Sequence, residues 1–496
     1  MERIWAWLKT RRCGQAVFLA VAAGIVAYTA TEYKPMLAGD AFEYCATLQA
    51  FEDHLTPDVR EADLDRLGPL YDWNRVCKAD CARLTATATA VDGKRYTHHF
   101  WAYSLTVLPM KMLLRLVHAR WELDAFHLTN LILMLVALYA VLFGLPWPLG
   151  RRFWFAGLIV LTPVLWYLRW PSTEVFSWSC VVVSIVFFER RALPAAALVA
   201  GLGALQNPPV LFLALYAVLL ALEPPRAFRR VAVTALCASV SLLPNAFYLW
   251  KFHRPSLMAI VGGFDDRLVS VHRVWSFVGD LNQGMLPYVP GLVLLGTTSA
   301  VLAIASGIQR RRWQEPALVA AMLVMIASCG VTPNWNAGEA TIQRYTIWMM
   351  PLFAWLIVLH TPPRTRNLAW GFVVAIQMVI ALAGSSKMFF LEHTRLARSV
   401  LTHAPSLYDP EPDIFAERLL HDEIPFDDKL PLAFVVPNGN QVTKLLADAK
   451  SLDRLPERFR VDPAWLASIR RQYARRRSRF YLEPPKGAVL LPAVPP

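Results

Sequence analysis

Apolar residues occur in long runs along most of the chain, and short polar segments separate these runs. Eleven runs approach the roughly 20 residues that a helix needs to cross a bilayer. They are Gln15–Thr31, Asp124–Leu145, Phe153–Leu168, Val175–Phe188, Leu193–Leu205, Val210–Leu222, Val231–Trp250, Tyr288–Ile308, Pro316–Val331, Tyr345–His360 and Leu368–Gly384. The pattern predicts an all-α polytopic membrane protein with about eleven transmembrane helices, several of them short.

A twelfth apolar run, Trp101–His118, contains Pro109, Lys111 and Arg115 within its pattern. A helix with charges on one side and apolar residues on the other lies in the membrane interface rather than across the bilayer. We therefore expect this run to form an amphipathic helix on the membrane surface.

The composition agrees with a membrane protein. Of the 496 residues, 56% are hydrophobic and only 18% are charged, and the mean hydropathy is +0.36, values outside the range of ordinary soluble domains. The formal charge of +13 could indicate a nucleic-acid partner, but the basic residues cluster in short loops between apolar runs. The charge therefore reflects membrane topology, and no nucleic-acid partner is expected.

Arginine-rich loops alternate with loops that contain few basic residues. Every second connection carries at least two arginines: "PLGRRF", "ERRAL", "EPPRAFRR", "QRRRWQEP" and "TPPRTRN". Because short basic loops stay in the cytoplasm, the N-terminus is expected inside and the other connections outside. The first run could instead be a cleaved signal peptide, which would leave the later orientations unchanged.

The chain is expected to divide into two parts. Residues 1–384 form the transmembrane module, with residues 32–123 as a large first extracytoplasmic loop, and residues 385–496 form a small extracytoplasmic α/β domain. The latter should contain a strand at "LAFVVP" and a helix around Ala464–Arg479. Its basic run "RRQYARRRSRF" could contact anionic lipid or glycan, or form a solvated helix face. In the first loop, Cys77 and Cys81 could form a disulfide or remain free thiols on one helix face.

Polar motifs gather in the outer connections, whereas the predicted helices are almost free of charge. Transporters usually carry ionisable residues within their helices near the bilayer midplane. The distribution favours chemistry at an extracytoplasmic membrane surface.

The first outer loop opens with "GDAFEY", in which Asp40 and Glu43 are three residues apart. Gly39 permits a close backbone approach, and Glu43 follows Asp40 by one helical turn. A carboxylate near a low-dielectric surface can act as a general base toward a hydroxyl. The alternative, that Asp40 only caps the following helix, stays open.

His98 and His99 lie near the end of the same loop, in "THHF". Either could contact a phosphate, and two histidines beside two carboxylates could bind a divalent metal. Because adjacent residues point apart on a helix or a strand, we expect at most one of them to face the site. The alternative is an exposed interfacial histidine with no such role.

Further polar residues lie at the outer ends of the predicted helices, and they are candidates for a substrate cavity. They are Glu174, Asn207, Asn282, Gln283 and Tyr345. Turns and helix caps compete with this interpretation, because acids suit the first turn of a helix and asparagines suit turns. Arg344 is the only basic residue of the last short outer loop; arginine is the preferred bidentate partner of a phosphate, although it could also snorkel to the interface.

These motifs resemble the GT-C class of integral membrane glycosyltransferases. The resemblance rests on "GDAFEY" after the first span, on "HHFWAYSLTVLPMK" at the surface helix, on "DLNQGMLPYVP" and on the late "GEATIQRY". It spans roughly Asp40 to Tyr345 as scattered short motifs. Family-39-like enzymes, similar to protein mannosyltransferases and aminoarabinose transferases, would be the nearest relatives.

The resemblance implies inverting transfer of a hexosyl or pentosyl group from a polyprenyl-phosphate-linked donor to a glycan, lipid or protein acceptor. It implies Asp40 as the catalytic base, with Glu43 assisting it or holding a metal, and Arg344 with His98 or His99 at the donor phosphate. The implied location is a bacterial inner membrane, in contact with membrane lipids, with the site on the periplasmic side.

Members of this class often have adjacent acidic residues, whereas Ala41 and Phe42 separate the acids here, and this leaves a divalent metal cofactor open. A transporter or flippase of lipid-linked sugars is the competing hypothesis, since it would not need Asp40 as a base. A polymerase or ligase of surface polysaccharide ranks third, because its long outer loop would come late in the chain. Here the long loops are early and C-terminal.

Overall fold

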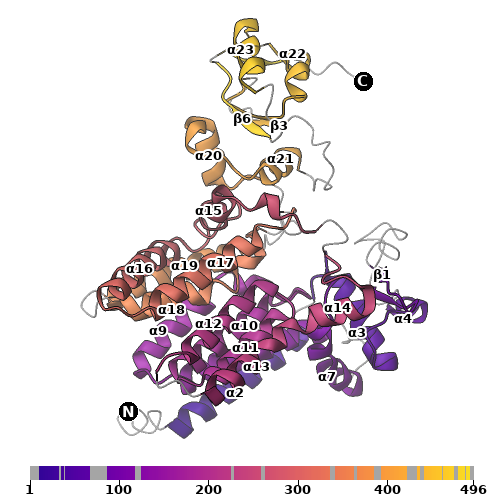
Figure 1. The fold of residues 1–496 in the computed structure, drawn as a ribbon, viewed down its shortest axis with the longest axis vertical. Coiled ribbons are helices and arrows are strands. Elements are labelled where there is room, and N and C mark those ends of the chain that lie inside the picture. The colour runs from indigo at the N-terminus through magenta and orange to yellow at the C-terminus, as the bar shows by residue number, and fades with distance from the viewer. Residues whose placement is uncertain are drawn as a thin grey trace. The chain divides into compact units, whose positions relative to one another are not determined.

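In the computed structural model the chain forms two compact units (Figure 1). Unit one consists of Met1–Asp266, Val289–Val331 and Tyr345–Ser385, and unit two consists of Arg267–Tyr288, Thr332–Arg344 and Ser386–Pro496. The structure describes residues 11–32, 35–37, 39–67, 87–117, 124–224, 228–258, 263–333, 335, 341–361, 366–384, 392–421, 433–435, 441–460, 462–473, 479–485 and 487–491.

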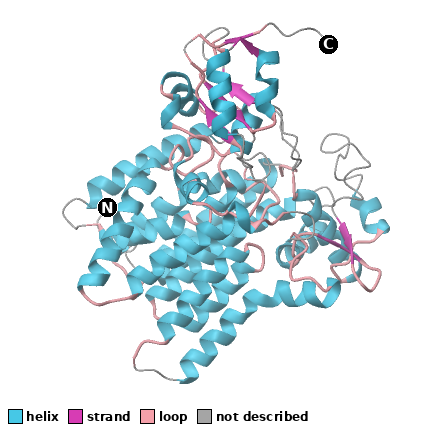
Figure 2. Cartoon of the chain, turned by 45° about the horizontal axis from the view of Figure 1, so that its top comes forward, coloured by secondary structure: helices cyan, strands magenta, loops and turns pink. Residues whose placement is uncertain are grey.

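Unit one is built almost entirely of helices (Figure 2). They are α2 (Arg11–Glu32), α3 (Ala41–His54), α4 (Glu61–Leu67), α7 (Ala102–Val117), α8 (Asp124–Tyr139), α9 (Leu149–Val160), α10 (Glu174–Glu189), α11 (Leu193–Ala204), α12 (Leu211–Ala221), α13 (Phe228–Ala238), α14 (Leu243–Phe252), α16 (Pro290–Gln309), α17 (Gln314–Cys329), α18 (Met350–His360) and α19 (Arg366–Gly384). Strands β1 (Thr87–Thr89) and β2 (Arg95–Thr97) form an antiparallel hairpin with Thr87 opposite Thr97.

Each of the apolar runs expected to span the membrane forms helix, so the mainly helical architecture predicted from the sequence is confirmed. Among the described residues, four helical stretches are long and apolar enough to cross a membrane. They are Arg12–Thr31, Asp124–Gly144, Phe228–Phe252 and Pro290–Gln309. The other runs form shorter helices, and the number of eleven spans stays a prediction.

The run Phe153–Leu168 is not helical to its end. α9 ends at Val160, and a 3₁₀ turn, η3 (Pro163–Tyr167), begins after Thr162, whose hydroxyl accepts a hydrogen bond from the Val164 N–H. Proline lacks an N–H and clashes with the preceding turn of a helix, so the α-helix stops before Pro163.

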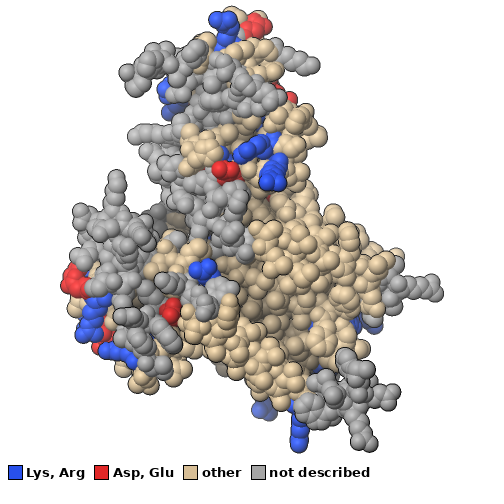
Figure 3. Space-filling model, turned by 180° about the vertical axis from the view of Figure 1, so that it is seen from behind, with Lys and Arg blue, Asp and Glu red and all other residues tan. Residues whose placement is uncertain are grey.

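Small residues allow the helices of unit one to approach closely. A Cβ built on Gly296 of α16 would lie 2.5 Å from Cδ1 of Phe353 in α18, and one on Gly203 of α11 would lie 2.9 Å from Cβ of Cys180 in α10. Helices in membranes associate through such contacts, because lipid supplies no hydrophobic force between them. On the face seen in Figure 3, described charged side chains are sparse over the broad helical region, as a surface against hydrocarbon requires.

α7 confirms the helix predicted for the run Trp101–His118, and its charged residues face the protein. The buried Lys111 ammonium lies 2.7 Å from Gln49 Oε1 and 2.6 Å from one carboxylate oxygen of Glu52, and Arg115 lies 2.6 Å from the other. The opposite face exposes apolar side chains: Leu105, Met112, Leu113 and Leu116. This arrangement suits a helix resting on a membrane surface, and that location stays a prediction.

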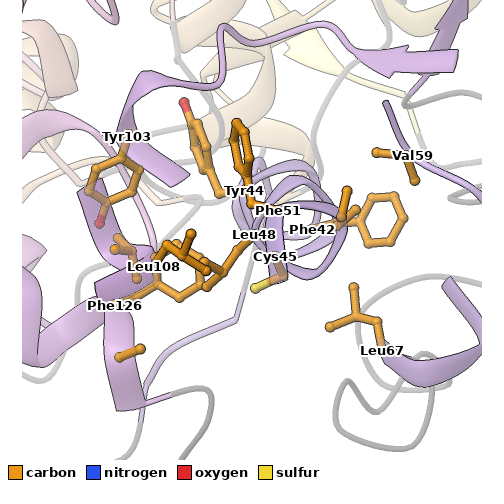
Figure 4. Packing of buried hydrophobic residues seen from close by; sticks show 14 of the residues in the cluster. Phe42, Tyr44, Cys45, Leu48, Phe51, Val59, Leu67, Tyr103, Leu108 and Phe126 are labelled. Atoms are coloured by element: carbon orange, nitrogen blue, oxygen red, sulfur yellow. The ribbon is translucent and has the colours of Figure 1, made fainter. Parts of the chain in front are cut away.

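A hydrophobic cluster holds α3 in place (Figure 4). Cys45 and Leu48 of α3 pack with Tyr103 and Leu108 of α7 and with Phe126 of α8. Full burial of a side chain such as Leu or Phe stabilises a fold by about 1.5–3 kcal/mol. The cluster therefore fixes the orientation of α3 and of the residues at its N-terminus.

Unit two is a small α/β assembly. Its helices are α15 (Val271–Gly279), α20 (Arg395–His403), α21 (Pro412–Leu420), α22 (Leu455–Arg458) and α23 (Pro463–Tyr473), and its strands are β3 (Ala433–Val435), β4 (Lys444–Ala447), β5 (Phe459–Arg460), β6 (Phe480–Leu482) and β7 (Val489–Leu490). An antiparallel sheet has the order β3-β4-β6, with Val435 opposite Lys444 and Leu446 opposite Tyr481, and β5 pairs with β7.

The strand predicted at "LAFVVP" is confirmed as β3, and the predicted C-terminal helix is confirmed as α23, which ends at Tyr473. Residues 474–478 of the basic run, like Cys77 and Cys81, lie outside the described residues. The outer connections Arg267–Tyr288 and Thr332–Arg344 belong to the same unit as the tail. The division of the chain at residue 384 stays a prediction.

Candidate active site

Asp40 stands directly before α3, on the turn that leads out of the first span. Gly39 has a φ of +52°, a left-handed conformation that glycine adopts at little cost. The Asp40 carbonyl accepts hydrogen bonds from the N–H groups of Glu43 and Tyr44 at 3.0 and 3.4 Å, whereas the Asp40 side chain makes no capping hydrogen bond to the helix. The capping role considered for this carboxylate is therefore absent from the described geometry.

Glu43 and the two histidines form a cluster with Asp40. Nδ1 of His99 lies 3.0 Å from Oε2 of Glu43, and the His99 N–H donates to the same oxygen at 3.1 Å. Nε2 of His99 lies 3.6 Å from Oδ2 of Asp40, and Nδ1 of His98 lies 3.7 Å from Oε1 of Glu43. The imidazole of His99 thus connects the two carboxylates. We call these four residues the acid–histidine cluster.

The expectation that at most one histidine faces the site is wrong. Both imidazoles lie within 4 Å of the Glu43 carboxylate. The alternation rule behind that expectation applies to regular helix or strand, but His98 and His99 occupy a bend between β2 and α7. Two successive side chains can therefore converge on one group.

Neighbouring elements hold this bend in position. The Thr97 hydroxyl lies 3.0 Å from the Thr47 hydroxyl of α3 and donates to the His99 carbonyl at 3.3 Å. The Tyr248 hydroxyl of α14 donates to the His98 carbonyl at 3.1 Å. The ring of Tyr44 packs on His99 with 5.3 Å between centroids.

The electrostatics of the cluster favour an ionised Glu43. Burial by itself raises the pKa of this carboxyl, but the charge of His99 and the hydrogen bonds from both histidines outweigh it and hold the pKa well below its ordinary value. Glu43 is therefore a fixed anion that orients the His99 ring. The Glu43 side chain is 12% exposed and that of Asp40 is 26% exposed, so Asp40 is the carboxylate that a substrate reaches more easily.

The cluster does not fit a divalent metal. Among the described residues, no group of three or more histidine, cysteine, aspartate or glutamate side chains is arranged to hold a metal ion. His99 Nδ1 already pairs with Glu43, and its ring lies between the two carboxylates that would share the ion.

The structure places Glu174 and Asn207 at the N-terminal end of α10. Glu174 is the first residue of that helix and is buried. The Asn207 amide donates to the hydroxyls of Ser177 at 2.7 Å and Thr173 at 3.3 Å. These bonds join the segment after α11 to α10, and a role in a substrate cavity stays a prediction for both residues.

Asn282 and Gln283 lie in unit two, on a turn organised by Asp280. One Asp280 carboxylate oxygen accepts the N–H groups of both residues at 2.8 Å, and the other accepts the Tyr408 hydroxyl at 2.9 Å. The Asn282 side chain is buried, donates to Tyr408 at 3.1 Å and accepts the Thr394 N–H at 3.1 Å. The described bonds make Asn282 an anchor for the tail, and its role at a substrate stays a prediction.

Arg344 and Tyr345 begin a 3₁₀ turn, η7 (Arg344–Thr346), and both are half-buried. Tyr345 packs near Trp348, with 6.3 Å between ring centroids. Trp335, in the same connection as Arg344, pairs instead with Arg273, whose guanidinium lies 5.0 Å from the centroid of its ring. Arg344 belongs to unit two and the acid–histidine cluster to unit one, so a shared role at the donor phosphate stays a prediction.

Sequence reasoning missed Tyr44 and Tyr248, which contact the cluster, and Trp170, which lies beside Gly39. Tyr44 follows Asp40 by four residues on one helix face, and that spacing could have indicated it. A Cβ on Gly39 would lie 3.7 Å from the Trp170 ring, and Tyr248 reaches His98 across 150 positions. No local signal could have identified these two.

No protein-family model matches the chain, and no curated protein matches it in sequence. Its fold is similar to solved structures of an oligosaccharyltransferase from Archaeoglobus fulgidus, a glycosyltransferase of the GT-C class. The apo form is 12% identical with a TM-score of 0.49, over 88% of this chain and 62% of that chain. A complex with Zn and sulfate is 12% identical with a TM-score of 0.47, over 95% of this chain and 74% of that chain.

The complex of archaeal oligosaccharyltransferase AglB with an inhibitory peptide and a dolichol-phosphate is 10% identical, with a TM-score of 0.45. That match covers 88% of this chain, which spans 62% of that relative's length. At this level of similarity no residue's role carries over, and the proposals below rest on the geometry of this chain.

Proposed function

We propose that the protein transfers a sugar from a polyprenyl-phosphate-linked donor to an extracytoplasmic acceptor, with inversion and with Asp40 as the general base. The observation that carries the proposal is the acid–histidine cluster, in which His99 lies 3.0 Å from Glu43 and 3.6 Å from Asp40. Glu43 orients His99, and His99 in turn orients the more exposed Asp40. An oriented carboxylate beside a membrane surface is the group that such a transfer needs.

In the proposed reaction, the Asp40 carboxylate takes the proton of the acceptor hydroxyl while the hydroxyl oxygen attacks the anomeric carbon. The bond from that carbon to the phosphate oxygen breaks, and polyprenyl phosphate leaves with the electron pair. Attack opposite to the leaving group inverts the anomeric configuration. The proton remains on Asp40 until water removes it.

The leaving phosphate carries negative charge that a cation can stabilise. Arg344, whose guanidinium can bind phosphate in bidentate fashion, and His98 or His99 are each proposed candidates for this contact. Glu174, Asn207 and Tyr345 of unit one, and Asn282 and Gln283 of unit two, are each proposed as substrate contacts. The prenyl chain stays in the bilayer, which agrees with the sparse described charge on the broad helical face seen in Figure 3.

The acceptor is a glycan, lipid or protein on the extracytoplasmic side, and the transferred group is a hexosyl or pentosyl group. The alternation of arginine-rich loops supports this side, because short basic loops tend to stay in the cytoplasm. A bacterial inner membrane with a periplasmic site is the location that we propose.

Sugar transfer by the purified protein tests this function. Polyprenyl-phosphate hexoses and pentoses serve as donors and a crude envelope fraction as acceptor, with and without a chelator. We expect Asp40→Asn to fold normally and to lower the transfer rate at least about 100-fold, the contribution of a general base. Glu61→Gln is the matched control, because Glu61 is an exposed carboxylate of α4 paired with Arg95.

Transfer by Asp40→Asn at the wild-type rate would show that Asp40 is not the base. Loss of transfer with the chelator would show that a metal takes part after all. If the wild type transfers none of the donors but moves them between leaflets of proteoliposomes, the flippase hypothesis replaces the transferase.

A further inference from the structure

A second site lies at the other end of α10, away from Glu174. A cavity of about 540 Å³ is lined there by the ends of α10, α12, α17 and α18, and it contains no residue of the acid–histidine cluster. The 15 steps from Glu174 to Glu189 correspond to a rise of about 22 Å along the helix. The volume lies within the range of small-molecule binding sites.

Two carboxylates of the cavity are positioned by neutral hydrogen-bond donors. Glu189 accepts hydrogen bonds from the indole N–H groups of Trp147 and Trp355, both at 2.8 Å. Glu315 accepts the Ser306 hydroxyl at 2.8 Å, and His360 Nε2 lies 3.9 Å away from it. The indole and hydroxyl groups are neutral donors, so they fix the carboxylate oxygens without forming ion pairs with them. A cationic group is the natural ligand for this part of the cavity.

Aromatic rings form one wall of the cavity. The Trp355 ring stacks on Phe188, with 5.7 Å between centroids and 20° between planes, and Tyr216 packs against Phe188 at 5.3 Å. The face of an aromatic ring attracts an ammonium group, most strongly for tryptophan. A small ammonium can therefore contact Trp355 and the carboxylate of Glu189 together.

Arginines at the same cavity supply the opposite charge. Arg191 and Arg312 line it and are exposed, and Arg191 also lies 3.6 Å from Glu223. Both belong to the arginine-rich loops "ERRAL" and "QRRRWQEP", which are expected at the cytoplasmic surface of the bilayer. Arginines in that position pair with lipid phosphates.

We propose that this cavity binds the headgroup of an aminophospholipid from the cytoplasmic leaflet. The primary ammonium enters between Glu189 and Glu315 against Trp355, the phosphate meets Arg191 and Arg312, and the acyl chains lie along Leu220 and Leu359. Both signs of charge in one cavity favour a zwitterionic headgroup over an anionic one. This site does not depend on the proposed sugar transfer.

Native mass spectrometry of the full-length protein in detergent tests the site, with phosphatidylethanolamine, phosphatidylcholine or phosphatidylglycerol added in separate experiments. We expect the wild type to retain phosphatidylethanolamine about tenfold more than the other two, because a charged hydrogen bond changes affinity by about this factor or more. The quaternary ammonium of phosphatidylcholine cannot donate such a bond. Free phosphoethanolamine should not displace the lipid, because it lacks acyl chains.

Two variants separate the parts of the site. Glu315→Gln should lower retention of phosphatidylethanolamine about tenfold and leave phosphatidylglycerol unchanged, since only the former has an ammonium. Arg312→Gln, at an exposed position that should not affect folding, should lower retention of both. Glu61→Gln is the control and should change neither. Equal retention of the three lipids by the wild type, or unchanged lipid preference in Glu315→Gln, overturns the proposal.

Discussion

Glu43 acts in the acid–histidine cluster through the negative charge of its carboxylate, and not through solvent exposure of its side chain. It is held by two imidazoles and one backbone N–H, and its pKa lies well below the ordinary value because the interactions with His99 and His98 outweigh the effect of burial. A carboxyl whose pKa falls on folding stabilises the fold above its unfolded pKa of about 4.3, and this contribution is lost as the pH falls through the folded pKa. The stability of the fold and the orientation of the His99 ring therefore both depend on the negative charge of Glu43.

We predict that Glu43→Gln lowers the free energy of unfolding by about 1.5–3 kcal/mol at pH 7, the range for hydrogen bonds to charged groups. The difference from the wild type should shrink as the pH falls below about 4. The turnover number for sugar transfer should fall about tenfold while the KM for donor stays the same, because His99 is no longer oriented. Thermal unfolding across pH and steady-state kinetics measure these effects. A loss of stability that is independent of pH would contradict the linkage.

At the scale of elements, close helix contacts limit which residues can change. Gly296 in α16 leaves no room for a Cβ beside Phe353, whereas a Cβ on Gly24 in α2 would meet nothing within 4 Å. Both glycines lie inside helices, where alanine is favoured over glycine by roughly 1 kcal/mol. Comparing the stability of alanine variants at these two positions therefore separates the effect of packing from the effect of helix propensity.

We predict that Gly296→Ala destabilises the protein by about 1–3 kcal/mol, the cost of overpacking a tight contact. Gly24→Ala should leave stability unchanged or slightly raised. Melting temperatures in detergent compare the two variants. A Gly296→Ala protein as stable as Gly24→Ala would mean that α16 and α18 are not in close contact.

Helix positions could be predicted from the sequence because apolar runs are local signals. The predicted run Phe153–Leu168 nevertheless extended past Pro163, whereas α9 ends at Val160. Asp40 and Glu43 could be placed together, one turn apart, because their spacing is also a local signal. The contact between Glu43 and His99 crosses 56 positions and depends on a bend, so no periodicity could reveal it. The hydrogen bond from Asn282 to Tyr408 joins residues that are 126 positions apart, and no periodicity of the sequence indicates it either.

At the scale of the whole molecule, ion pairs inside unit two join its early and late segments. Glu411 is buried and pairs with His272 at 2.7 Å and with Arg273 at 3.1 Å. The hydrogen bond with Glu411 outweighs partial burial and raises the pKa of His272 to about 9. A histidine with a raised pKa stabilises the fold below its unfolded pKa of about 6.5 and loses this contribution as the pH rises through 9.

We therefore predict that unit two loses about 1 kcal/mol of stability between pH 6.5 and 9, a modest value because His272 is 45% exposed and solvent screens the pair. His272→Gln should remove this pH dependence. His403→Gln should retain the pH dependence. His403 is an exposed histidine of α20 that is hydrogen-bonded to the Ser399 carbonyl. Urea unfolding of the full chain at both pH values provides the measurement. An equal change of unfolding free energy with pH in the wild type and in His272→Gln would refute the assignment.

The acid–histidine cluster also has a consequence for biosynthesis. Its four residues lie between positions 40 and 99, so a ribosome has finished all of them before it begins α8. The hydrophobic cluster that orients α3 also contains Phe126 of α8, and the Tyr248 hydroxyl of α14 donates to the His98 carbonyl. The groups proposed for catalysis are thus synthesised early, but the contacts that hold them are complete only after α14 has been made.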